Sequence, residues 1–158
     1  MELRFIADVN VGRLAKWLRI LGYDTLFQND LDDDELIRIA VREKRVLLTK
    51  DTRILRRGLA FTGQLRLLLI RSSKVREQLQ QVVQLLNLKV SNPFSLCPEC
   101  NQPLIPRGRS EVKGLVPPYV FQTQTHYMQC PSCQRIYWRG THWQRMRKEL
   151  ERLIKEAG

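Results

Sequence analysis

Four cysteines stand in two pairs in the C-terminal third of the sequence. Cys97 and Cys100 form one Cys-x-x-Cys pair, and Cys130 and Cys133 form the other. Each pair can fold as a tight knuckle that points two thiolates at one ion, and two knuckles complete a tetrahedral zinc site. Because four thiolates leave no position for water, we expect this zinc to be structural. Iron on the same thiolates and paired redox disulfides are the alternatives.

Acidic residues suggest a second kind of chemistry. Asp8 and Asp51 each follow a short apolar segment, and Asp32, Asp33 and Asp34 open a helical one. Carboxylates gathered at one place repel one another unless a cation lies between them, and magnesium or manganese prefers such oxygen ligands. An ion there can activate water for cleavage of a phosphodiester. Alternatively, these acids only start helices or cap them.

The elements that must position these acids alternate along residues 1–90. We expect strands at 3–7, 25–27, 46–49 and 65–70, and helices at 11–21, 32–43, 52–57 and 74–86. This alternation predicts an α/β domain with a largely parallel sheet. The carboxyl ends of parallel strands meet at one edge, where α/β proteins bind ligands. Asp8 and Asp51 should therefore lie at the same edge.

Beyond residue 90 the helical periodicity stops and prolines become common. We place a domain boundary there, with a first domain over 1–90. The second, over 91–158, is a small β zinc ribbon that ends in a helix at about 141–156. A β module with so little apolar core needs a metal staple. The aromatic and basic residues of 137–143 either stack bases and hold phosphate or pack the ribbon against the final helix.

The charge of the chain favours a polyanionic partner. Lys and Arg number 27 against 16 acids, a net charge of +11, and both parts are basic. Nucleic acid is the commonest partner of such a chain, although many cytosolic proteins are basic without one. No segment approaches the ~18 apolar residues of a membrane span, and the N-terminus does not read as a signal peptide. We therefore expect a cytoplasmic protein with no membrane partner.

An ordered set of motifs resembles the Mut7-C family, in which a PIN-like RNase domain is followed by a zinc ribbon. The resemblance covers nearly the whole chain. It implies a PIN-like three-layer α/β/α fold with a central parallel sheet. The motifs are Phe5–Asp8, Gly12–Arg19 with Leu21–Asp24, Asp32–Leu36, Leu47–Asp51, the two Cys-Pro-x-Cys pairs and Tyr137–Trp143.

The resemblance also implies a site. Asp8, Asp33 and Asp51 would hold magnesium or manganese, with Asp34 as the alternative to Asp33. Thr49 matches a small hydroxyl residue that orients the carboxylates or the water in PIN-like domains. PIN nucleases often have a fourth acid after the fourth strand. Residues 71–74 contain none, so Ser73 is the candidate replacement, and one metal ion or two remain open.

The leading hypothesis is a metal-dependent endonuclease that hydrolyses single-stranded RNA, with the ribbon adding affinity. The alternative is a non-catalytic RNA-binding module that acts in RNA processing or on ribosomes. A phosphate-accepting receiver domain is a third class, but it needs a second acid after the first strand and a strand-end lysine. The candidate RNA contacts, some of them alternatively plain solvated side chains, are Arg13, Lys50, Arg53, Arg56, Arg57, Arg139, His142 and Trp143.

Overall fold

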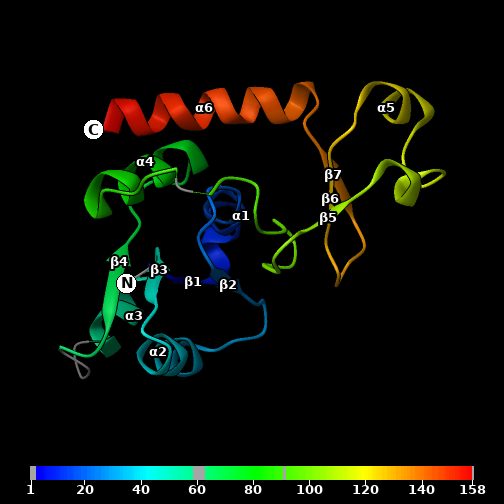
Figure 1. The fold of residues 1–158 in the computed structure, drawn as a ribbon. Helices are drawn as coiled ribbons and strands as arrows, with labels where there is room; N and C mark the ends of the chain where they lie inside the picture. Colours follow the sequence, from blue (N-terminus) through cyan, green and yellow to red (C-terminus); the bar gives the residue numbers. More distant parts are fainter. Residues whose placement is uncertain (1–2, 59–62, 91, 158) are drawn as a thin grey trace.

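The computed structural model describes residues 3–58, 63–90 and 92–157. Its N-terminal part contains four parallel strands in the order β2-β1-β3-β4 (Figure 1). The expected parallel α/β sheet is therefore confirmed. The strands are β1 (Phe5–Ala7), β2 (Thr25–Phe27), β3 (Val46–Thr49) and β4 (Arg66–Leu69).

Helices cover both faces of this sheet. Successive residues of a strand point to opposite faces, so the strands contribute side chains to a buried cluster on each side. Phe5 and Val46 enter a buried cluster with α1 and α4 on one face. Ile6 and Leu47 enter a second cluster with α2 and α3 on the other face. The result is the three-layer arrangement that the family resemblance implies. The helices are α1 (Gly12–Ile20), α2 (Asp33–Arg42), α3 (Thr52–Gly58) and α4 (Val75–Leu86).

The ends of these helices follow from local chemistry. The Asp32 carboxylate accepts a hydrogen bond from the Glu35 amide at 2.8 Å and so caps α2. After α1, Gly22 adopts a left-handed φ of 101°, as a glycine at a helix C-terminus does. A short 3-10 turn, η1 (Val9–Val11), precedes α1, and Asp8 caps it. The turn places Asp8 directly between the sheet and α1.

The C-terminal part contains a small antiparallel sheet in the order β5-β6-β7. Figure 1 shows it beside the larger sheet, on the right. Between β5 and β6 the chain makes a 3-10 turn, η3, and a short helix, α5. We call residues 108–126 the insert. The elements are β5 (Ile105–Arg107), η3 (Arg109–Val112), α5 (Pro118–Thr123), β6 (Tyr127–Gln129) and β7 (Ile136–Trp138).

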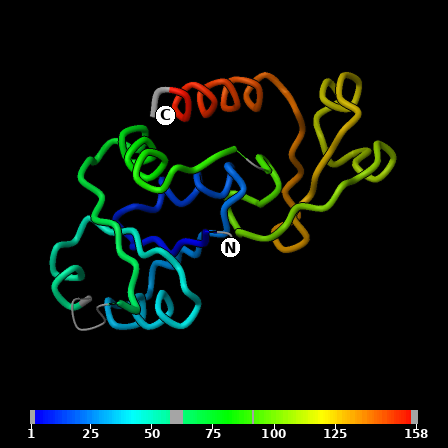
Figure 2. Tube along the Cα trace, turned by 60° about the vertical axis from the view of Figure 1, so that its left-hand side comes forward, coloured from blue at the N-terminus to red at the C-terminus, as the bar shows by residue number. Residues whose placement is uncertain are grey.

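The last helix, α6 (Thr141–Ala157), runs back from the ribbon over α4, as both views show (Figures 1 and 2). Leu150 and Leu153 of α6 are buried in the same cluster as Leu79 and Val83 of α4. The final helix therefore packs against the N-terminal part while the ribbon lies at its far end. Among the described residues, none of the helices has the length and apolar character required to cross a membrane.

Candidate functional site

The four cysteines lie close enough together to hold a zinc ion. Their sulfur atoms are all within 4.8 Å of one another, and none of the cysteines is in a disulfide. In each knuckle the residue after the second cysteine bonds back to the first: the Asn101 amide donates to the Cys97 carbonyl at 2.8 Å, and the Gln134 amide donates to the Cys130 carbonyl at 3.0 Å. Four sulfur donors in this arrangement fit tetrahedral zinc.

The thiols of this cluster differ in acidity without a metal. A hydrogen bond from the Arg135 backbone lowers the pKa of Cys133 to about 6. Burial raises the pKa of Cys100 to about 12. Four adjacent thiolates repel one another, so zinc binding must release protons from the cluster.

The first knuckle is bound to the N-terminal part of the chain. Arg19 of α1, only 5% exposed, donates to the Thr25 carbonyl at 2.9 Å and to the Pro98 carbonyl at 2.8 Å. Asn101 accepts from the Thr25 amide at 3.0 Å and donates to the Asp24 carboxylate at 2.7 Å. The zinc knuckle is thus continuous with α1 and β2 through hydrogen bonds. Spacing alone gave no sign of the partners of Arg19 and Asn101.

An ion pair adds to this junction. The Lys16 ammonium of α1 lies 2.7 Å from the carboxylate of Glu99, which stands between the two cysteines of the first knuckle. Lys16 also lowers the pKa of Glu99. Both side chains are well exposed, so the pair adds little stability to the junction.

At the carboxyl edge of the large sheet, one hydroxyl connects two of the predicted acids. Thr49 Oγ1 donates to Asp8 Oδ2 at 2.8 Å and accepts from the Asp51 amide at 3.0 Å. Asp8 is only 7% exposed and also accepts from the Val9 amide at 2.8 Å and from Asn10 Nδ2 at 3.2 Å. The parallel sheet therefore brings Asp8 and Asp51 to the same edge.

Two arginines of α3 bind the acids around this edge. Arg53 donates to both carboxylate oxygens of Asp51 at 3.2 Å, and its amide donates to one of them at 2.8 Å. These bonds from Arg53 lower the pKa of Asp51. Arg57 donates to Asp34 at 3.2 Å. The guanidinium groups thus engage the carboxylates of Asp51 and Asp34.

The three consecutive aspartates at the start of α2 make different contacts. Asp32 is the helix cap, and Asp34 is exposed and paired with Arg57. Asp33 is half-buried and acts electrostatically on Arg53, which also binds Asp51. Asp33 and Asp51 thus both act on the charge of Arg53, and the hydrogen bonds of Arg53 go to Asp51. Within residues 3–58, 63–90 and 92–157, the side chains grouped tightly enough to chelate one ion are the four cysteines.

At the end of β4 lie the predicted Ser73 and an acid, Glu77, that the sequence did not single out. Lys50 Nζ donates to Ser73 Oγ at 2.6 Å, while the Lys50 amide donates to Asn10 Oδ1 at 3.2 Å. The Ser72 hydroxyl donates to the carboxylate of Glu77 in the first turn of α4. Glu77 is thus an acid beside this edge, and it stands three residues beyond the segment where a fourth acid was expected.

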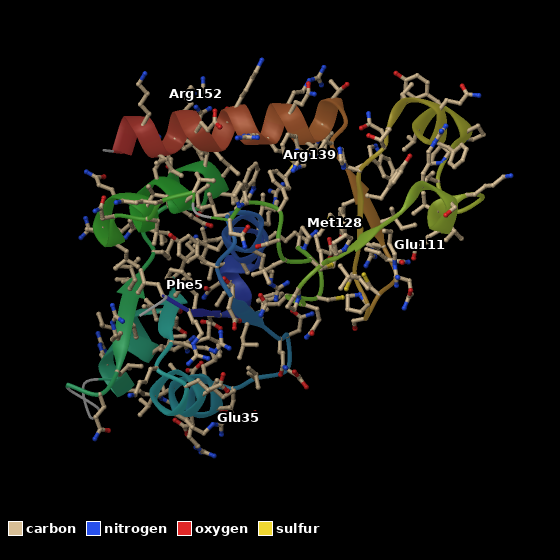
Figure 3. The ribbon with its side chains drawn as sticks, viewed as in Figure 1. Phe5, Glu35, Glu111, Met128, Arg139 and Arg152 are labelled. Carbon is tan, nitrogen blue, oxygen red and sulfur yellow. The ribbon has the colours of Figure 1, made fainter. Side chains whose placement is uncertain are left out.

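The remaining candidate RNA contacts lie in two places. Arg13 in the first turn of α1 and Arg56 of α3 are exposed in the N-terminal part. Arg139 lies where β7 leads to α6 (Figure 3), and His142 is exposed just after it.

Trp143 has a packing role. Its ring lies 4.8 Å from that of Phe94 between centroids, and the guanidinium groups of Arg139 and Arg147 lie over it at 5.3 and 5.4 Å. Phe94 in turn packs against the large core cluster. The interpretation of Trp143 as a packing residue therefore has direct support, while base stacking by it stays a prediction.

The comparison with known families agrees with this architecture. The family model described as Mut7-C RNAse domain matches residues 3–150, nearly the whole chain. No curated protein and no solved structure gave a significant match. The match supports a ribonuclease-type function with RNA as the substrate.

Proposed function

The chain belongs to the Mut7-C RNase domain family, and from this premise we propose that it is a divalent-metal-dependent endonuclease for single-stranded RNA. One observation carries the proposal: the Thr49 hydroxyl joins Asp8 and the backbone of Asp51 at the carboxyl edge of the sheet. Ligand sites of open α/β sheets form at this edge. Acidic groups held there by a shared hydroxyl are suited to oxygen-ligated magnesium or manganese.

In this proposal Asp8, Asp33 and Asp51 hold the ion, with Asp34 as the alternative to Asp33. When bound, the ion supplies an activated water and offsets charge on the phosphate during in-line attack. Thr49 and Asn10 keep the Asp8 carboxylate in one orientation through their hydrogen bonds. Hydrolysis would leave a 5′-phosphate and a 3′-hydroxyl.

The basic residues around the edge would hold the RNA backbone. Arg53 and Arg57 bind Asp51 and Asp34. A cation that takes over these carboxylates would release both guanidinium groups for phosphate, which they bind well through two parallel hydrogen bonds. Lys50 and Arg56 would extend this cationic surface. The zinc ribbon, with Arg139 and His142, would add affinity away from the cleaved bond.

The test is cleavage of a labelled single-stranded RNA by the full zinc-loaded chain with manganese or magnesium. Asp8→Asn and Asp51→Asn should each abolish metal-dependent cleavage, since each removes a charged ligand. Asp30→Asn is the matched control, because Asp30 is an exposed acid outside the proposed site, and it should cut like the wild type. Cleavage that persists in Asp8→Asn at the wild-type rate would show this assignment to be wrong.

A second candidate function, a non-catalytic RNA-binding module, is favoured by one observation. The carboxylates of Asp51 and Asp34 are paired with arginines, and a metal ion would have to displace these arginines in order to bind. This candidate predicts RNA binding that weakens steeply with salt, with no metal-dependent product. Detection of a product that disappears in Asp51→Asn would exclude it.

A further inference from the structure

The ribbon contains a groove that the proposed nuclease site does not use. Its volume is about 440 Å³, which is within the range of small-ligand sites. It lies at the second zinc knuckle and the adjoining strands, far along the chain from Asp8 and Asp51. The residues that line it are Leu115, Gln129, Gln134, Arg135, Ile136 and Trp138.

The groove exists because the two faces of the ribbon sheet are covered differently. Met128 and Tyr137 pair across β6 and β7 and pack with the cysteines on one face. Tyr127 and Trp138 pair on the other face, where the insert packs on them through its valines. Next along this second face comes the pair of Gln129 and Ile136, and there the groove lies. Trp138 is its half-buried apolar wall.

Polar groups in the groove are held in place. Gln129, 9% exposed, accepts from Arg107 Nε at 2.8 Å and donates to the Gln134 carbonyl at 3.0 Å and to its side-chain oxygen at 3.2 Å. Gln134 also donates to the Pro131 carbonyl at 3.0 Å. The Gln134 amide is thereby fixed at the rim of the groove beside the apolar wall. A planar ligand with polar edges suits such a combination.

The charge around the groove favours an anionic ligand. Residues 102–140 contain five basic side chains and one acid, Glu111, a net charge of +4. Residues 97–140, which include Glu99 of the first knuckle, carry +3 without the cysteines, and the −2 of four thiolates and a zinc ion leaves a net charge of +1. Leu115, 64% exposed, and Tyr119, 74% exposed, add apolar surface on the insert. Apolar surface interleaved with cations is typical of sites for single-stranded nucleic acid.

We propose that this groove binds one unpaired nucleotide of RNA, with its base against Trp138, its polar edge at Gln134 and its phosphate at Arg135. The choice of RNA as the ligand rests on the proposed function. The groove would hold the strand at a second point, so that the RNA is anchored on the ribbon while another segment reaches the acidic edge. Binding there requires bases, because phosphate alone leaves the Trp138 wall unused.

The first experiment locates the base. Full-length, zinc-loaded Asp8→Asn protein is mixed with a short single-stranded RNA that contains 4-thiouridine, irradiated, digested and mapped by mass spectrometry. Cross-links to residues 127–138 or to Leu115 are expected. Cross-links found only outside these segments would overturn the proposal.

The second experiment measures affinity in the same Asp8→Asn background. Trp138→Leu keeps an apolar side chain on the ribbon core but removes the stacking surface, and it should weaken RNA binding about tenfold. The loss should vanish for an abasic oligonucleotide of equal length, which a purely structural effect would not explain. Arg135→Gln should weaken binding to both oligonucleotides and lower the salt slope by about one.

A matched control and the zinc content make these results decisive. Arg66→Gln removes an equal charge at the start of β4, an exposed position away from the ribbon, and should bind like the parent. Zinc content and melting temperature are measured for each variant, because Arg135 also lies next to Cys133. Zinc-replete variants that bind both oligonucleotides like the parent would overturn the proposal.

The proposed groove and the proposed nuclease activity can be refuted independently of each other. Cleavage that depends on Asp8 but is indifferent to Trp138 and Arg135 would leave the nuclease standing and exclude the groove. Base-dependent binding that needs Trp138, without any cleavage, would support the groove and exclude the nuclease.

Discussion

Thr49 is the residue on which the geometry of the acidic edge depends. Its hydroxyl donates to a carboxylate, Asp8, that is almost fully buried. Thr49→Val keeps the shape and removes the hydroxyl, so we expect a loss of about 1.5–3 kcal/mol in the free energy of unfolding, the usual contribution of a hydrogen bond to a charged group. Urea unfolding measures this, and Thr49→Ser should recover most of the loss. Equal stability of Thr49→Val and wild type would show that the bond contributes nothing.

Arg53 controls the protonation of Asp51. Its side-chain hydrogen bonds are the largest cause of the lowered pKa of Asp51. In Arg53→Gln the pKa of Asp51 should rise toward the ordinary value for aspartate, as followed by carboxyl NMR titration. Because the folded pKa is depressed, the stabilisation is present above the unfolded pKa and is lost as the pH falls through the folded one. Arg53→Gln should therefore lose stability near neutral pH but little at strongly acidic pH, and an unchanged titration would refute the link.

At the scale of single elements, Gly22 lies between α1 and β2, against the backbone of the segment that leads into the ribbon. It has a left-handed φ, and a Cβ there would lie 2.5 Å from the Asn92 carbonyl oxygen. Gly22→Ala should cost about 1 kcal/mol for the backbone conformation and more for the contact. Gly114→Ala is the control, since Gly114 has a φ of 79° but nothing within 4 Å of such a Cβ. Equal melting temperatures for the two variants would show that the contact costs nothing.

Periodicity in the sequence predicts elements better than it predicts their partners. Apolar spacing gives α1, α2 and α4 within a residue or two, because each buries one face against the sheet. The Cys-x-x-Cys spacing likewise predicts the zinc cluster, because each knuckle is formed by residues close together in the sequence. The 3-10 turn after Asp8 has no apolar period and was not predicted. Glu77 was missed for a related reason: its place beside the edge depends on the turn between β4 and α4.

At the scale of the whole molecule, contacts between distant residues decide what the sequence does not. Arg19 meets Pro98 across 79 residues, and Asn101 meets Asp24 across 77. Such pairs leave no periodic pattern, so the alternation of elements predicts the parallel sheet but not the attachment of the ribbon to it. The same holds for α6, whose return to α4 follows from Leu150 and Leu153 only once both helices are in place. The ribbon and the nuclease fold are consequently one hydrogen-bonded structure.

Because of these hydrogen bonds, we expect that loss of zinc lowers the local stability of α1 and β2 as well as that of the ribbon. Removing zinc should free the first knuckle and take the Pro98 carbonyl and the Asn101 amide away from α1 and β2. Arg19 would then be a buried cation short of one acceptor, which costs more than an ordinary lost hydrogen bond. Hydrogen exchange should therefore accelerate roughly tenfold in peptides covering residues 16–27 after chelation.

Two comparisons make the hydrogen-exchange measurement specific. Peptides from β4 serve as the internal control, because β4 has no contact with the first knuckle among the hydrogen bonds of the described residues. In the zinc-loaded protein, Asn101→Ala should reproduce part of the effect on residues 16–27 while zinc stays bound. If chelation accelerates exchange only within residues 97–138, the two parts are energetically independent, and the hydrogen bonds between them transmit nothing. If residues 16–27 respond as expected, the zinc in the ribbon stabilises the helix that begins beside Asp8.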